Sequence, residues 1–369
     1  MAHSNGVTRR RALLGTAALF ASLGLGSSPP AAAATPLKQL ARRRGLFYGS
    51  AVQLTHLQQE ADLTDALAGE CAAIVPEWEM KWGAMETRRG RPQYYRCDAF
   101  ADFARQNGVW IRGHTVLWHR NLPAWVEEVL SETPDFSIIE DRTRGLMGRY
   151  GTAVIPEWDV LNEILEPEDG RPDGLRQSIF LEAFGFSYIK DTLQIAREIR
   201  PDARLYINEY GLDYNNCTAR DRRRAMLRLV ERLKAQGAPL DAIGIQAHLR
   251  PGGAPFSPRA LRRFLADLAG MGVKIAVTEL DAREQDMSLP VRERDAIVAD
   301  EVARYLDVVL DEKAVIGVCT WGLSDRHSWL TTTAMRDEGQ VNRGLPLDEE
   351  LAPKPMYQAI ATAIRQRPA

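Results

Sequence analysis

Short apolar runs alternate along the chain with longer segments whose apolar residues recur at helical spacing. Each run is bounded by polar residues or glycine, the pattern of a strand buried on both faces. Eight strands are predicted, at 45–51, 72–76, 109–114, 157–161, 204–208, 242–246, 274–278 and 314–320. Helices are predicted between them, for example at 180–200, 218–236 and 291–310. This alternation predicts an α/β fold, a (β/α)8 TIM barrel in a single domain.

An open doubly wound sheet is the competing architecture. Such a sheet usually has fewer strands and often carries a glycine-rich phosphate-binding turn after the first of them. No G-x-G-x-x-G pattern follows the first predicted strand, which ends at Ala51. Beyond Pro36 there is no linker, repeat or low-complexity stretch to mark a second domain. The barrel is therefore favoured, and we assign residues 35–369 to it.

The first 34 residues have the pattern of an export signal. Three arginines at 9–11 precede an apolar stretch that runs to Gly26, and four alanines follow at 31–34. A basic start, an apolar middle and an Ala-x-Ala end are typical of a signal peptide, and adjacent arginines of the twin-arginine type. A disordered tail or a short membrane anchor is the alternative interpretation. We expect cleavage near Ala34 and a periplasmic or secreted protein.

Composition excludes several classes of protein. Of the 369 residues, 45% are hydrophobic and 26% are charged, a balance typical of globular proteins. A formal net charge of −2 offers no basic field to a nucleic acid. No apolar run reaches the roughly 20 residues that a membrane span needs. The four cysteines lack metal-binding spacing and predict no particular disulfide. We expect a monomer that binds neither nucleic acid nor membrane.

Working residues of a (β/α)8 barrel lie at the carboxyl ends of the strands and in the loops that follow. Those positions are rich here in carboxylates, tryptophans and amides. Two carboxylates are placed to act together: Glu163 follows the fourth predicted strand and Glu279 the seventh, three steps apart around the ring. Glycosidic cleavage needs such a pair, one acid to protonate the leaving oxygen and one group to attack the sugar or activate water. Tryptophans offer flat faces to sugar rings, and polar side chains bind their hydroxyls.

Each candidate also has a structural interpretation when taken alone. A glutamate at a strand end is more often an ion-pair partner than a catalyst, Trp125 fits a core position, and His248 fits a buried histidine. His114 and His119 have a spacing possible for metal ligands, but the first strand lacks the H-x-H pattern usual in metal-dependent barrel hydrolases. We predict no metal and no cofactor. The joint pattern at eight ordered strand ends favours catalysis.

The ordered motifs resemble those of glycoside hydrolase family 10, the endo-β-1,4-xylanases. The most specific are RGHTVLWH at 112–119, WDVLNE at 158–163 and TELD at 278–281, and EMKW at 79–82 and GIQAHL at 244–249 add further matches. The resemblance covers nearly the whole mature chain. It implies a secreted endo-1,4-β-xylanase that cleaves internal bonds with retention of anomeric configuration. Its partners would be xylan and xylo-oligosaccharides.

The resemblance also implies roles for individual residues. Glu163 would be the proton donor and general base, and Glu279 the nucleophile. Support for this pair is expected from Asn162, Gln246, His248 and Asp281, with Gln246 beside the nucleophile and Asp281 behind His248. Substrate contacts are expected from Glu77, Lys81, His114, Trp118, Trp125, Asn208, Tyr210, Trp321 and Trp329.

Two sites depart from the family's pattern. Trp78 stands where the family usually has an asparagine that binds the next sugar on the non-reducing side. The run NEYG at 208–211 stands where NDYN is commoner, on the leaving-group side, so Gly211 replaces a polar side chain. A related retaining β-glycanase acting on glucan or mixed-linkage polymers is the alternative function. A non-catalytic sugar-binding barrel is a second alternative, against which both glutamates argue.

Overall fold

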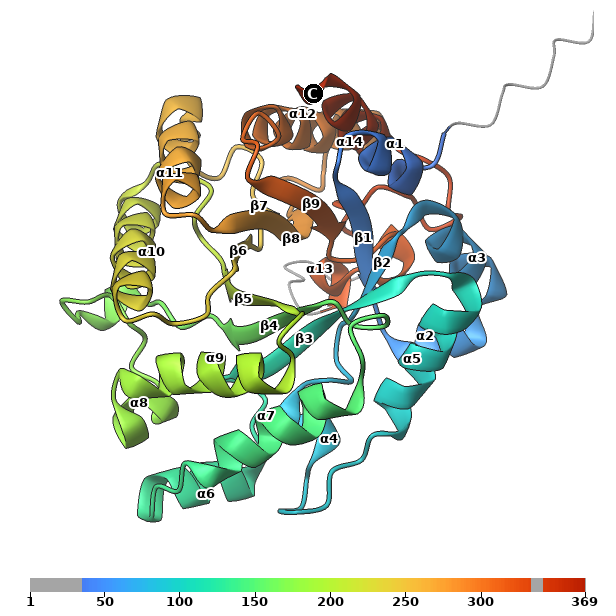
Figure 1. Cartoon of the computed structure of the whole chain (residues 1–369). Helices are drawn as coiled ribbons and strands as arrows, with labels where there is room; N and C mark the ends of the chain where they lie inside the picture. Colours follow the sequence, from blue (N-terminus) through green and yellow to red (C-terminus); the bar gives the residue numbers. More distant parts are fainter. Residues whose placement is uncertain (1–34, 333–340, 369) are drawn as a thin grey trace, which may run out of the picture. The chain divides into compact units, whose positions relative to one another are not determined.

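The computed structural model describes residues 35–332 and 341–368, and the predicted signal peptide at 1–34 lies outside the described residues. The strands are β1 (Phe47–Val52), β2 (Ala73–Pro76), β3 (Trp110–Trp118), β4 (Glu157–Asn162), β5 (Arg204–Glu209), β6 (Ala242–Ile245), β7 (His248–Leu249), β8 (Lys274–Ala282) and β9 (Val315–Thr320). All pairings between them are parallel. Strand β6 pairs with β8, and β9 with β1, so eight strands form a closed ring (Figure 1). The predicted barrel is confirmed.

Helices surround this ring of strands (Figure 1). They are α1 (Leu37–Arg43), α2 (Leu54–Gln59), α3 (Ala61–Glu70), α4 (Trp82–Met85), α5 (Tyr95–Asn107), α6 (Ala124–Glu132), α7 (Ser137–Arg149), α8 (Ile179–Phe184), α9 (Ser187–Ile199), α10 (Cys217–Ala235), α11 (Pro258–Gly270), α12 (Val291–Val309), α13 (Trp329–Thr332) and α14 (Pro355–Gln366). The first and last of them, α1 and α14, pack against each other. Among the described residues, no helix combines the length and the apolar character that crossing a membrane requires.

The single helix expected at 180–200 is in fact two. Gly185 has a φ of 61°, in the left-handed region that ends helices, and it separates α8 from α9. The apolar spacing continues across this break, which is why the periodicity alone predicted one element. The amphipathic segments expected at 218–236 and 291–310 are α10 and α12, each within one residue of the predicted bounds.

Two strands run further than expected, and both carry candidate site residues at their ends. Strand β3 was predicted to end at His114 and continues to Trp118. Strand β8 was predicted to end at Thr278 and continues to Ala282, where its last residues pair with β7. In β8 the carboxyl groups of Glu279 and Asp281 interrupt the apolar pattern, because they are buried against other polar groups, whereas Val116 and Leu117 of the β3 extension lie in the apolar core.

Candidate active site

Glu279 lies in the carboxyl-terminal half of β8, and both of its carboxylate oxygens have a donor. Oε1 accepts a hydrogen bond from Asn208 Nδ2 at 2.6 Å, and Oε2 lies 3.2 Å from His248 Nε2. Burial alone would raise the pKa of Glu279, but the hydrogen bond and charge of His248 bring it below its ordinary value. The carboxyl group is therefore held ionised.

His248 stands between two carboxylates. Its Nδ1 lies 3.0 Å from Asp281 Oδ1, and Asp281 is paired with it across β7 and β8. Burial would lower the pKa of His248, yet the charge of Asp281, with a smaller effect of Glu279, raises it well above the ordinary value. Trp329 Nε1 donates to the other oxygen of Asp281 at 2.6 Å. Trp329, expected as a substrate contact, thus also fixes the carboxylate behind the histidine.

Asn208 links the two halves of the candidate site. Its Nδ2 lies 2.9 Å from Asn162 Oδ1 as well as 2.6 Å from Glu279 Oε1, and its own Oδ1 accepts from Thr278 Oγ1 at 2.6 Å. A Cβ at Gly244 on β6 would lie 2.3 Å from Asn208 Oδ1, so only glycine leaves room for this amide. We expected Asn208 to contact substrate; the structure places it on the nucleophile candidate.

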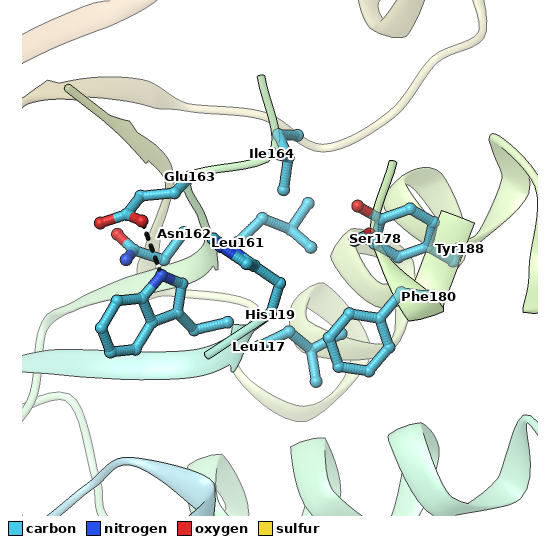
Figure 2. A pocket seen from close by; sticks show the side chains of 10 residues that line it. Leu117, His119, Leu161, Asn162, Glu163, Ile164, Ser178, Phe180 and Tyr188 are labelled. Atoms are coloured by element: carbon cyan, nitrogen blue, oxygen red, sulfur yellow. Dashed lines mark hydrogen bonds between the residues drawn. The ribbon is translucent and has the colours of Figure 1, made fainter. Parts of the chain in front are cut away.

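Glu163 directly follows β4 and has a φ of 57°, the left-handed region that side chains other than glycine rarely adopt. Trp118 Nε1 donates to its Oε2 at 2.9 Å, the bond drawn in Figure 2. Gln246 Nε2 donates to its Oε1 at 3.2 Å. Gln246 was expected beside the nucleophile, but its side chain contacts Glu163, while its backbone carbonyl accepts the Glu279 N–H at 3.0 Å.

The segment that carries Glu163 also lines a small, largely apolar pocket (Figure 2). Leu117, Leu161, Ile164 and Phe180 are among the side chains around it. His119 lines it too, and burial, with the charges of nearby arginines, lowers the pKa of that imidazole to about 3, so it is neutral. Among the described residues, no three histidine, cysteine or acidic side chains are grouped as a metal would need.

Aromatic rings surround the amine of Lys81. Its Nζ lies 4.8 Å from the ring centroid of Trp118, 5.7 Å from that of Trp78 and 6.0 Å from that of Trp321. Burial lowers the pKa of Lys81, and Glu279 is the strongest of the carboxylates that oppose this shift. The cation is thus placed near both the rings and the glutamate pair, where apolar faces and a hydrogen-bond donor are offered together.

Comparison with known proteins agrees with this geometry. Residues 36–363 match the model of glycosyl hydrolase family 10. The chain belongs to this family. Endo-1,4-beta-xylanase 3 of Hypocrea jecorina is 33% identical over 330 residues, covering 89% of this chain and 85% of that protein. An endo-1,4-beta-xylanase of Agaricus bisporus is 35% identical over 316 residues, covering 85% and 86%. Xylanase 10B of Thermotoga petrophila, solved with xylobiose, has a TM-score of 0.79 at 26% identity over 90% of this chain and 97% of that one.

Two further expected substrate contacts of this family 10 enzyme, Tyr210 and Trp125, are held by hydrogen bonds to other protein groups. Tyr210 donates its hydroxyl to Glu166 Oε2 at 2.7 Å. Trp125 Nε1 donates to the carbonyl of Glu86 at 2.9 Å. Glu77 is partly buried, and burial raises the pKa of its carboxyl to about 6 although Lys81 opposes the shift. The two hydrogen bonds fix the orientation of the Tyr210 and Trp125 side chains.

The family 10 site includes buried residues that the strand-end positions did not predict. Asp159 in the middle of β4 accepts hydrogen bonds from both terminal nitrogens of the Arg112 guanidinium, at 2.6 and 2.7 Å. Its carboxylate also lies 2.9 Å from His114 Nδ1. Burial would raise the pKa of Asp159, but the charge of Arg112 lowers it. His114, an expected sugar ligand, is therefore oriented from below by a carboxylate. The only sequence signal was a charged residue between two apolar neighbours, Trp158 and Val160.

Proposed function

We propose that this family 10 member is an exported endo-1,4-β-xylanase that hydrolyses internal β-1,4-xylosidic bonds of xylan with retention of anomeric configuration. One observation carries the assignment of roles: the two glutamates have opposite environments. Glu279 is held ionised by the His248 cation and by Asn208, as a nucleophile requires. The carboxyl group of Glu163 is bonded by two neutral donors, Trp118 and Gln246, and not by a cation.

The reaction follows as a double displacement. An oxygen of Glu279 attacks the anomeric carbon, the bond from that carbon to the leaving oxygen breaks, and Glu163 gives its proton to that oxygen. Water then attacks the same carbon, passes a proton to Glu163 and releases Glu279. Because each step inverts the carbon, the net outcome is retention.

The aromatic side of the site supports xylan over glucan as the substrate. Trp321 is buried and packs with Ala51, Val75 and Cys319, so its ring is a fixed wall. The ring lies 5.2 Å from that of His114, which narrows the space for a sugar beside it. A xylose unit lacks the hydroxymethyl group of glucose and needs less room at such a wall. The xylanase names and the xylobiose complex among the relatives support the same choice.

The proposal of export is supported by the arginines at 9–11 and the alanines at 31–34. Expression with a carboxyl-terminal tag, followed by fractionation and amino-terminal sequencing, tests it. Mature protein that begins near residue 35 outside the cytoplasm supports export. Full-length protein in the membrane fraction indicates the anchor instead.

The decisive experiment for the reaction is proton NMR of xylohexaose in the first minutes of digestion by purified residues 35–369. β-Anomeric products that precede mutarotation support both cleavage and retention. α-Anomers first would contradict the nucleophile role of Glu279. Initial rates on xylan and on carboxymethyl-cellulose, measured in parallel, separate the xylanase from a glucanase, and no turnover of either would leave a sugar-binding barrel.

A further inference from the structure

The backbone at Glu163 needs support that its side-chain contacts do not provide. A left-handed φ is unfavourable for a residue with a Cβ, so the surroundings must impose it. The direction of the carboxyl group depends on this φ, because the side chain leaves the main chain at the strained residue. Any group that fixes the main chain from Glu163 to Glu166 therefore fixes where the carboxyl group points.

Charged side chains bind this main chain on both sides of the strained residue. Arg176 Nε donates to the carbonyl of Glu163 at 2.8 Å. Two residues further on, the carbonyl of Leu165 accepts from Arg222 Nη1 at 2.5 Å, and the N–H of Leu165 donates to Glu209 Oε2 at 2.9 Å. Arg222 and Glu209 also lie 3.4 Å apart, so as an ion pair they hold the two peptide groups on either side of the Leu165 Cα.

Two further residues, Glu166 and Tyr210, contact both arginines. Glu166 accepts from Arg222 Nη2 at 2.6 Å through one oxygen, and its other oxygen lies 3.2 Å from Arg176 Nη2. Tyr210 donates to Glu166, accepts from Arg176 at 2.9 Å, and places its ring 4.2 Å from the guanidinium carbon of Arg222. Both arginines are thereby tied to the loop after β4 and to the end of β5.

Burial makes the arrangement rigid. The side chain of Arg222 is 2% exposed and Glu209 is fully buried, so water competes little for their hydrogen bonds. Burial also raises the pKa of Glu209 to about 8, with Arg222 opposing the shift. Removing Arg222 would leave the buried carboxyl of Glu209 without its cation and the carbonyl of Leu165 with only the longer hydrogen bond from Arg176 Nη2, at 3.3 Å, so the segment would have to rearrange.

We propose that Arg222, together with Glu209 and Arg176, is a positioning residue that imposes the left-handed backbone of Glu163 and so aims the catalytic acid at the leaving oxygen. This inference rests on the proposed acid role of Glu163. Arg176, Arg222 and Glu209 all bind main-chain atoms and not the carboxyl oxygens of Glu163. They therefore act on the direction of that carboxyl group and not on its charge.

The leaving group provides the readout. General acid catalysis matters for a sugar leaving group, which must be protonated, and hardly matters for dinitrophenolate, which departs without a proton. The experiment compares kcat/KM for xylohexaose and for dinitrophenyl β-xylobioside, since kcat/KM reports the steps up to the glycosyl-enzyme. Arg222→Met is expected to lower kcat/KM for xylohexaose at least tenfold more than for the aryl substrate.

Arg223→Met is the matched control. Arg223 is the next residue of α10, is also buried, and also donates to main-chain carbonyls, those of Leu212 and Tyr214, away from the Glu163 segment. It is expected to change both substrates by the same factor. Arg222→Lys, which retains the charge but only one donor nitrogen, is expected to lie between Arg222→Met and the parent, and it serves as the test if Arg222→Met does not fold.

The results distinguish failure of the positioning role from failure of the proposed function. If Arg222→Met and Arg222→Lys fold and change both substrates equally, or if Arg223→Met shows the same split, the positioning role is wrong. If Glu163→Ala shows the split and the arginine variants do not, only this inference fails. If the parent cleaves neither substrate, or Glu163→Ala shows no split, the proposed function itself fails.

Discussion

The two glutamates of the site are held in opposite ways. Glu279 lies in a regular strand, and its carboxylate is bound by a cationic histidine and an amide. Glu163 lies just beyond a strand in a strained conformation, and here the charged groups bind the backbone while neutral donors meet the carboxyl. A nucleophile needs a fixed charge, whereas an acid that becomes a base needs a fixed position and a changeable charge. The molecule provides each residue with the kind of constraint that its proposed step requires.

Removing the proposed nucleophile should have the largest effect. Glu279→Ala deletes the attacking oxygen, and we expect kcat on xylan to fall by about six orders of magnitude, the scale seen for lost nucleophiles. The fold should persist, because the vacated space stays lined by Asn208 and His248, and circular dichroism checks this. Steady-state rates on xylan and on an aryl xylobioside should fall alike. A residual rate above about 1% of the parent on either substrate would remove Glu279 from the mechanism.

Removing the proposed acid should have a smaller and substrate-dependent effect. Glu163→Ala is expected to lower kcat/KM on xylan by about 10²–10⁴-fold, the usual contribution of a general acid. On dinitrophenyl β-xylobioside the same variant should lose little kcat/KM, while kcat falls because water is no longer activated in the second step. Equal losses on both substrates would show that Glu163 does not protonate the leaving group.

Removing the histidine cation should move a pH profile. Because His248 lowers the pKa of Glu279 against the effect of burial, His248→Asn should raise that pKa. A protonated Glu279 cannot attack, so activity should be lost at a higher pH on acidification than in the parent, and the acid limb of kcat/KM should shift upward. His327→Asn, whose imidazole pairs with Glu60, is the control and should leave this limb in place. An unmoved limb in His248→Asn would mean that the charge of Glu279 is held by other groups.

The fold was predictable because each barrel strand is buried on both faces and reads as an apolar run between polar residues. The boundaries were less so. Strand β8 continues through Glu279 and Asp281 because those carboxylates are met by His248, Asn208 and Trp329. No local pattern of residues contains that information, since the partners come from three other elements, β5, β7 and α13.

The residues of the candidate site were predicted better than the groups that each of them contacts. Asn208 and Gln246 both end strands and both carry amides, but which glutamate each one meets depends on Gly244 and Thr278, which place Asn208 across the barrel. Arg222 had no signal at all, because it is one of several arginines in α10 and only the fold turns it toward the loop after β4.

Trp78 offers the finest test, at the edge of the site where neither kind of constraint operates. Trp78 is 43% exposed, and the centroid of its ring lies 5.7 Å from Lys81 Nζ. It therefore presents an apolar face beside the cation, where the family usually has the amide of an asparagine. Stacking on a second sugar contributes about 0.5–1.5 kcal/mol, so Trp78→Ala should raise KM for xylohexaose by about 2–12-fold with kcat nearly unchanged. An aryl β-xyloside, which has only one sugar, should show no change.

Trp78→Phe should recover most of the affinity because it keeps a flat face, whereas Trp78→Asn should do so only if a hydrogen bond serves the same sugar. If the alanine variant weakened both substrates equally, Trp78 would act by holding Lys81 near the glutamate pair and not by binding a sugar of its own.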